Sequence, residues 1–171
     1  MNVIHLLARR RVALGFATAL ATIVFAHPTW GTWRAGFLVA LAGEAGRIWA
    51  AGHLEKSREV TRSGPYRWTR HPLYVGSTII AVGIVIASRS AGVGVLATLY
   101  MATTLTAAIR TEEAFLRDTF GSDYDRYRDS RAEPMPRWFS FGRAIRNREY
   151  RAVAGLLAGF ALLAMKVVGS R

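Results

Sequence analysis

Two kinds of residue are scarce in this sequence, and each scarcity removes a class of chemistry. The 171 residues include no cysteine, which excludes disulfides, thiolate metal ligands and a cysteine nucleophile. There are 11 acidic residues against 23 Lys and Arg, so the formal net charge is +12. The four histidines are scattered without the spacing of a ligand set, and we predict no metal site. Apolar residues are plentiful instead, since 51% of the chain is hydrophobic.

Charged residues are also absent from three long stretches. These cover residues 12–33, 71–88 and 90–109. Each is close to the length of roughly 20 residues with which a helix crosses a hydrocarbon layer. The stretches lack the polar and apolar alternation of barrel strands. Because a backbone in lipid must satisfy its polar groups within the segment, we expect helices.

Two further apolar stretches contain ionisable residues. Residues 35–51 include Glu44 and Arg47, and residues 152–168 include Lys166 near their end. Ionisable groups inside a span mark functional sites by default, although Glu44 and Arg47 are also spaced to neutralise each other on one helix face. With the three uncharged stretches, they predict an all-α fold: a polytopic integral membrane protein with about five transmembrane helices in a single domain.

Most of the basic residues fall on one side of such a bundle. If five helices alternate in direction, the N-terminal arginines and the segments 52–72 and 110–151 lie on that side, and the other side receives few basic residues. The positive-inside rule makes this side the cytosol, with a cytoplasmic N-terminus and a C-terminus outside. Contact with anionic membrane lipids then accounts for the net charge, and no nucleic-acid partner is predicted.

The two cytosolic segments hold the least usual residue clusters. The first contains GPYRWTRHPLYVG from Gly64, with a turn at its start and Pro72 as an early residue of the next helix. The second contains EEAFLRDTFGSDYDRY from Glu112, with aromatic residues at helix-like spacing. Taken alone, Arg70 and His71 are a cation pair at a helix end, and the two glutamates pair with arginines on a helix surface.

Together, the two motifs resemble the signature of the isoprenylcysteine carboxyl methyltransferase and phospholipid methyltransferase superfamily. That signature combines Gly-Pro-Tyr, Arg-His-Pro-x-Tyr-x-Gly and a downstream Glu-Glu with Phe-Gly-x-x-Tyr-x-x-Tyr, and the order and spacing agree from about Gly43 to Pro136. SRAEPMPRW departs from the Val-Pro-Arg that many members carry after the last tyrosine. The resemblance implies S-adenosylmethionine as methyl donor, held in a cytosolic pocket built from the loop 52–72 and the segment 110–151.

The resemblance also implies which residues bind the cofactor. Nine positions match the motifs: Arg70, His71, Pro72, Tyr74, Gly76, Glu112, Glu113, Tyr124 and Tyr127. The carboxylates can neutralise the ammonium group of a sulfonium cofactor, the cations can hold its carboxylate or ribose, and the tyrosines can stack or donate hydrogen bonds. Three further candidates are Arg47, Tyr66 and Arg131. Methyl transfer is a direct displacement that needs alignment and desolvation, and no residue is identified as a catalytic base.

The methyl acceptor is predicted only as a class. A cofactor held at the cytosolic face favours a lipophilic acceptor that enters from the membrane, either a carboxylate like that of isoprenylcysteine or an amine like that of a phospholipid. Two other functions stay open, an NADPH-dependent membrane reductase of the sterol reductase type and a non-catalytic membrane scaffold or carrier. Such reductases share the Arg-His-Pro-x-Tyr-x-Gly element, but an acidic residue often follows its glycine, whereas Ser77 follows Gly76 here. Inverted repeats would favour a carrier, and the sequence has none.

Overall fold

The computed structural model describes residues 3–169, and it describes side chains from residue 13 onward. This part of the chain consists of helices and the segments that connect them, with no strand. In chain order the elements are α1 (Val3–Phe25), α2 (Trp30–Ala51), η1 (Gly64–Arg67), α3 (Pro72–Ser88), α4 (Ala91–Phe120), α5 (Ser122–Arg128), α6 (Phe141–Arg146) and α7 (Tyr150–Gly169). The all-α fold class is therefore confirmed for the described residues.

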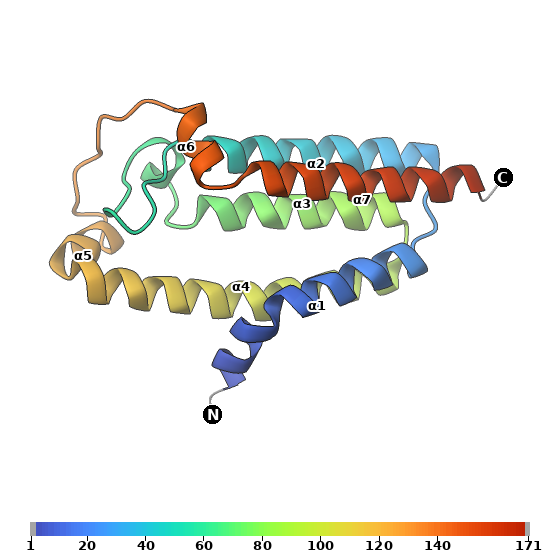
Figure 1. The fold of residues 1–171 in the computed structure, drawn as a ribbon, viewed down its shortest axis with the longest axis horizontal. Helices are drawn as coiled ribbons and strands as arrows, with labels where there is room; N and C mark the ends of the chain where they lie inside the picture. The colour runs from blue at the N-terminus through green and yellow to red at the C-terminus, as the bar shows by residue number, and fades with distance from the viewer. Residues whose placement is uncertain (1–2, 170–171) are drawn as a thin grey trace.

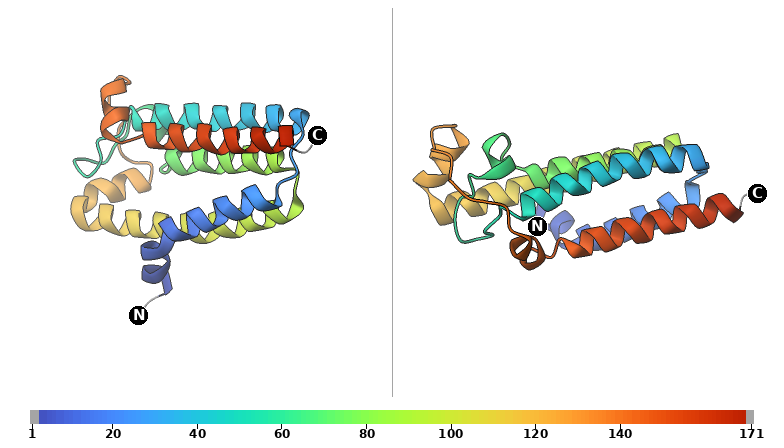
Figure 2. Two further views of the ribbon diagram at one scale, coloured as in Figure 1. Left: turned by 45° about the vertical axis from the view of Figure 1, so that its right-hand side comes forward. Right: turned by 90° about the horizontal axis from the view of Figure 1, so that it is seen from above.

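The long helices form an elongated bundle with its two polar segments at one end. Helix α2 packs most extensively against α3, α7 lies along α2, and α1 packs against α4 (Figure 1). The loop after α2, η1, α5 and α6 gather at one end, and the C-terminus lies at the other end. The views in Figure 2 show the same arrangement. Residues of the segments 52–72 and 110–151 thus come together, as the sequence predicts.

The first predicted span has the wrong boundaries. Helix α1 ends at Phe25, so residues 12–33 cover the end of α1, a turn and the start of α2. Pro28 lies in that turn, where its missing N–H and fixed φ do not interrupt a helix. Thr29 then caps α2, because its side chain accepts a hydrogen bond of 3.3 Å from the Thr32 N–H. The residues of this turn carry no charge, so the absence of charge over residues 12–33 does not reveal the break between α1 and α2.

Helix α4 is longer than the predicted span of residues 90–109. It continues to Phe120 and ends where Gly121 adopts a φ of +48°, a conformation that favours glycine. The last turns of α4 extend past the apolar stretch and carry Glu112 and Glu113 to the polar end of the bundle. In contrast, α3 begins at Pro72 and ends at Ser88, in agreement with the expected helix over 71–88.

Two of the described helices are long and apolar enough to cross a membrane by length and composition. These are α4 and α7. The apolar part of α1, Ala13–Phe25, and α3 are shorter apolar helices, and α2 belongs to neither group. The prediction of five transmembrane helices therefore stays a prediction beyond these two.

Small residues let α2 and α3 approach closely. A Cβ added at Gly43 would lie 2.7 Å from the carbonyl oxygen of Gly76, and one added at Gly83 would lie 2.5 Å from that of Gly36. Helix α7 is attached to α2 by the Trp33 indole, which donates a 2.8 Å hydrogen bond to the carbonyl oxygen of Phe160. This packing fixes the start of α3 against the end of α2, where the two polar segments meet.

Candidate functional site

A cavity of about 430 Å³ opens at the polar end of the bundle. Its walls come from the end of α2, the loop 54–61, η1, the first turn of α3, the second half of α4 and the residues just before α7. The volume lies within the range of roughly 300–1,000 Å³ that is usual for small-molecule sites. Eight sequence-predicted candidates line it: Arg47, Tyr66, Arg70, His71, Pro72, Tyr74, Glu112 and Tyr127.

The two sequence motifs meet through one carboxylate. His71 Nε2 lies 3.1 Å from Glu113 Oε1, and Arg70 Nη1 lies 3.3 Å from the same oxygen. His71 is the N-cap residue of α3, and Pro72 fixes the first helical position after it. The Tyr74 ring stacks on the His71 ring with a centroid distance of 5.7 Å. Glu113 does not line the cavity itself, but it contacts the side chains of Arg70 and His71, which do.

Charge at this junction is arranged around Glu113, which lies past the apolar stretch of α4. Burial alone would raise the pKa of the Glu113 carboxyl, but the His71 hydrogen bond and the Arg70 charge outweigh burial and lower it. Tyr124 is buried, and burial together with the negative charge of Glu113 raises the pKa of its hydroxyl. Glu113 is therefore an ionised centre that orients His71 and Arg70.

One polar atom at the cavity is left for a ligand. His71 Nδ1 is buried and has no hydrogen-bond partner within the described residues, and its nearest acidic neighbour is Glu112 Oε2 at 3.9 Å. Buried polar atoms are seldom left unpaired in folded proteins. The unpaired ring nitrogen of His71 lies in a cavity that Glu112 and Arg70 also line. This combination therefore suits a ligand that carries both a positively and a negatively charged group.

Tyr127 of α5 is hydrogen-bonded to η1. Its hydroxyl donates a 2.8 Å hydrogen bond to the carbonyl oxygen of Tyr66. Burial is the main cause that raises the pKa of Tyr127 to about 12, and burial also raises the pKa of Tyr66. Both phenols consequently stay protonated at neutral pH and act as hydrogen-bond donors and apolar walls. The hydrogen bond of Tyr127 assigns it a positioning role that its spacing in the sequence did not indicate.

A second hollow of about 560 Å³ adjoins the first one at these tyrosines. Tyr66, Arg70 and Tyr127 line both hollows. The second hollow also has the side chains of Arg62, Arg67 and Arg128 on its wall. This side of the site is therefore rich in guanidinium groups, which suit a carboxylate or phosphate.

Arg47 lies at the inner wall of the first cavity with several partners. Its Nε donates a 2.7 Å hydrogen bond to Glu149 Oε1, and Glu44 Oε2 lies 3.7 Å away. Its Nη1 donates to the Leu73 carbonyl oxygen at 3.3 Å and also to the Ser77 hydroxyl. Sequence reasoning selected Arg47 but missed Glu149. Glu149 is 102 residues from Arg47 and belongs to neither motif, so that only the folded chain brings the two together.

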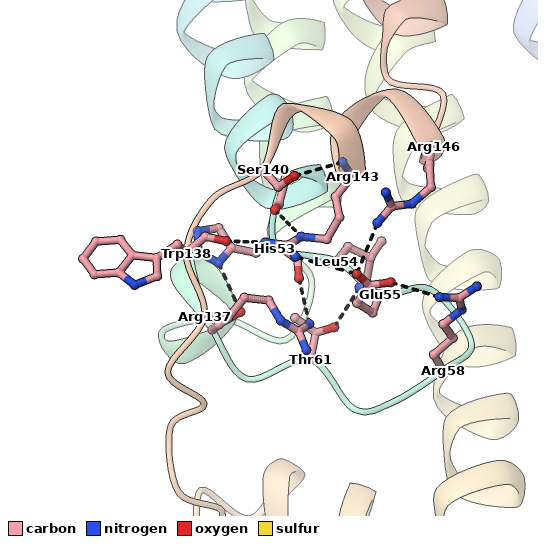
Figure 3. A network of polar contacts seen from close by, with 12 residues as sticks. His53, Leu54, Glu55, Arg58, Thr61, Arg137, Trp138, Ser140, Arg143 and Arg146 are labelled. Carbon is pink, nitrogen blue, oxygen red and sulfur yellow. Dashed lines mark hydrogen bonds and ion pairs between the residues drawn. The ribbon is translucent and has the colours of Figure 1, made fainter.

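Arginines from the segment before α6 and from α6 itself hold the loop after α2. Arg137 Nη2 donates a 2.8 Å hydrogen bond to Glu59 Oε2, and Arg143 Nε donates one of 2.8 Å to the Gly52 carbonyl oxygen. Figure 3 shows this network, in which the side chain of Arg146 also reaches Glu55. Because Glu55 and Glu59 line the cavity, these contacts shape its outer wall.

Four candidates from the sequence do not line the first cavity: Gly76, Glu113, Tyr124 and Arg131. Gly76 lies at the contact between α3 and α2, where an added Cβ would lie 2.5 Å from Arg47 Cγ. Arg131 is exposed and pairs with Asp129 at 2.6 Å. The structure thus gives Gly76 a packing role, and it places Arg131 outside the cavity.

These features describe an all-helical protein with a polar cavity at one end of its bundle and two helices long and apolar enough to cross a membrane. The chain belongs to the phospholipid methyltransferase family, whose model matches residues 13–123. The match includes the GPYRWTRHPLYVG motif and ends just past the paired glutamates and Gly121. It therefore confirms the superfamily to which the motifs point.

Two curated relatives carry names from metal resistance. The cobalt-zinc-cadmium resistance protein CzcN of Cupriavidus metallidurans is 34% identical over 125 residues, covering 68% of this chain and 57% of the relative. The nickel-cobalt-cadmium resistance protein NccN of Alcaligenes xylosoxydans xylosoxydans is 29% identical over 133 residues, covering 71% and 62%. The alignments thus span about three fifths of each relative. No solved structure matches the chain.

The residues that the structure describes include no group of three His, Asp or Glu side chains close enough to hold a metal ion. Metal resistance is a term in the names of the two relatives, and it describes those two proteins.

Proposed function

We propose that this protein binds S-adenosylmethionine in the cavity at the polar end of the bundle and transfers the methyl group to a lipophilic acceptor. The observation that carries this proposal is the contact of Arg70 and His71 with Glu113, at 3.3 and 3.1 Å. It joins the two parts of a methyltransferase motif at one cavity, within the region matched by the family model.

The residues present fit the groups of such a cofactor. Glu112 can neutralise the ammonium group, and the unpaired His71 Nδ1 can bond a polar group of the amino acid or the ribose. The guanidinium groups of Arg70 and its neighbours can hold the carboxylate. Tyr74 and Tyr127 offer aromatic surfaces to an adenine or a sulfonium. When bound, the cofactor supplies an electrophilic methyl group, and the protein supplies alignment and exclusion of water.

The acceptor enters from the membrane in this proposal. One wall of the cavity is formed by α4 side chains such as Ala107, Ala108 and Leu116, and α4 is one of the two helices able to span a bilayer. A lipophilic molecule can therefore lie along α4 with its reactive group at the polar end. We further propose five spans with the N-terminus in the cytoplasm and the C-terminus outside, which places the basic end of the bundle at the anionic leaflet.

Cofactor titration tests the proposal directly. Purified protein in detergent is titrated with S-adenosylmethionine and, separately, with NADPH, and thermal stability and bound ligand are measured. Saturable binding of the sulfonium cofactor alone is expected. Saturable binding of NADPH alone would contradict the proposal and favour a reductase, and binding of neither would favour a scaffold or carrier.

A further inference from the structure

The inner wall of the cavity contains an unbalanced charge cluster. Glu44 and Arg47 come from α2, and Glu149 immediately precedes α7. Arg47 Nε lies 2.7 Å from Glu149 Oε1 and 3.7 Å from Glu44 Oε2. Glu44 is 3% exposed and Glu149 is 6% exposed. Two buried carboxylates therefore share one guanidinium group.

This imbalance has an energetic consequence. Burying a charged group is costly unless it is paired and hydrogen-bonded. The Glu149 carboxylate has the short hydrogen bond with Arg47, whereas neither oxygen of Glu44 has a hydrogen-bond partner among the described residues. A cation or a proton brought to this wall relieves the excess negative charge, and an additional anion increases it.

Glu149 is the carboxylate of this cluster that borders the cavity. Glu149 and Arg47 both line it, and Glu44 does not. The other wall of the same cavity carries Glu112 and His71. The buried Tyr66 lines the same cavity as Glu112 and Glu149. Glu149 therefore faces the same space as the residues proposed to hold the cofactor.

At the inner wall, the same geometry argues against binding of an acceptor carboxylate. Arg47 is the cation of the inner wall, but its guanidinium group is already engaged by Glu149, the Leu73 carbonyl oxygen and the Ser77 hydroxyl. An acceptor carboxylate would have to displace Glu149 and would add a third negative charge to the cluster. An ammonium group needs no such displacement, because Glu149 lines the cavity and its contact with Arg47 is made through Oε1.

We propose that Glu149, oriented by Arg47, binds the ammonium group of an amine-bearing amphiphile and takes the proton that this group must lose before methylation. This inference rests on the proposed methyl-transfer function and names the residue that takes the proton from an amine acceptor. One N–H proton of the acceptor moves to the Glu149 carboxylate, and the freed electron pair forms the bond from nitrogen to the methyl carbon. The electrons of the broken carbon–sulfur bond stay on sulfur, which leaves as a neutral thioether. The nitrogen carries the positive charge again, now with one methyl group more.

The chemical stability of the product distinguishes the two acceptor classes. The purified protein is incubated with methyl-labelled S-adenosylmethionine and vesicles of phosphatidylethanolamine, or with N-acetyl-S-farnesylcysteine. An N-methyl label survives mild alkali, whereas a methyl ester releases its label as methanol. Base-stable label in the phosphatidylethanolamine product is expected. Base-labile label from the farnesylcysteine alone would overturn this inference while supporting the proposed methyl transfer, and absence of cofactor binding would overturn both.

Three variants test the role of Glu149. Glu149→Gln should lower transfer to phosphatidylethanolamine about 100-fold, the lower range for loss of an acid–base group, and Glu149→Asp should recover part of it. Glu133→Gln, which changes an exposed carboxylate outside the cavity, should match the wild type. Cofactor binding by Glu149→Gln should persist, which shows that the variant is folded. Unchanged transfer by Glu149→Gln would overturn the inference.

Binding without cofactor supplies a second readout. Dihexanoyl phosphatidylethanolamine should raise the melting temperature of the wild type and of Glu133→Gln, and it should have little effect on Glu149→Gln. Greater stabilisation of the wild type by N-acetyl-S-farnesylcysteine, in amounts that leave the detergent micelles unchanged, would contradict an ammonium site at Glu149.

Discussion

Gly43 and Gly76 face each other across the contact between α2 and α3, and a Cβ added to either would lie 2.7 Å from the carbonyl oxygen of the other. Gly76 is the glycine of the Arg-His-Pro-x-Tyr-x-Gly motif. Its position shows what a glycine in this motif does here: it allows the backbone of α3 to approach α2. That approach places Leu73 and Ser77 within hydrogen-bonding reach of Arg47.

Replacement of Gly43 by alanine should therefore destabilise the bundle. The added methyl group would lie 2.9 Å from the Ile80 nitrogen as well as against Gly76, and overpacking of this kind costs about 1–3 kcal/mol. Gly46→Ala in the same helix is the matched control, because a Cβ there meets no atom within 4 Å and alanine favours a helix by about 1 kcal/mol. Thermal or denaturant unfolding in detergent measures both variants. Equal stability of the two would mean that α2 and α3 are not in close contact.

Cofactor affinity should depend on the junction of the two motifs. His71→Ala removes the ring that bears the unpaired Nδ1, and Glu113→Ala removes the carboxylate that orients His71 and Arg70. Each change should weaken S-adenosylmethionine binding by about 1–3 kcal/mol, the range for loss of a partner of a charged group. Arg89→Ala, at the other end of α3, should leave the binding constant unchanged. If Arg89→Ala weakened cofactor binding as much as the other two changes, the cofactor site would not lie at the junction of the two motifs.

The hydroxyl of Tyr127 should stabilise η1 through one hydrogen bond. Tyr127→Phe deletes the 2.8 Å bond to the Tyr66 carbonyl oxygen and should lower the free energy of unfolding by about 1 kcal/mol. Amide hydrogen exchange should accelerate in residues 64–69, which that hydroxyl holds. Tyr150→Phe is the control, because the Tyr150 side chain is half exposed. If exchange in residues 64–69 were identical in both variants, another contact would be holding η1.

Apolar length and charge distribution were enough to predict the helical class and the common end of the two polar segments. Local signals in Pro72 and Gly121 also lie at helix boundaries, as expected from their backbone preferences. The turn at Pro28 was missed because it is as uncharged as the helices on either side. Glu149 was missed for a different reason: the pairing of a glutamate with an arginine 102 residues away depends on how α7 packs against α2. Sequence spacing describes contacts within a helix, whereas a cluster built from segments far apart in the chain is a property of the fold.

The buried His53 should make stability sensitive to mild acid. Its Nδ1 lies 3.1 Å from the Ser63 hydroxyl, and its ring packs against Gly64, where an added Cβ would lie 2.5 Å from His53 Cδ2. Burial, followed by the charges of Arg143 and Arg137, lowers the pKa of His53 below its ordinary value of 6.5. The unfolded chain therefore binds a proton at a higher pH than the folded chain does.

The sign of the effect follows from that difference. The stability contributed by neutral His53 is fully present above about pH 6.5, the ordinary value, and it is lost as the pH falls toward the lowered folded-state pKa. The melting temperature of the wild type should thus fall between pH 7 and pH 5.5, and His53→Gln should show a smaller fall because its side chain does not titrate. His27→Gln, which replaces an exposed histidine at the other end of the bundle, should follow the wild-type curve. A wild-type decline that persists unchanged in His53→Gln would assign the acid sensitivity to other groups.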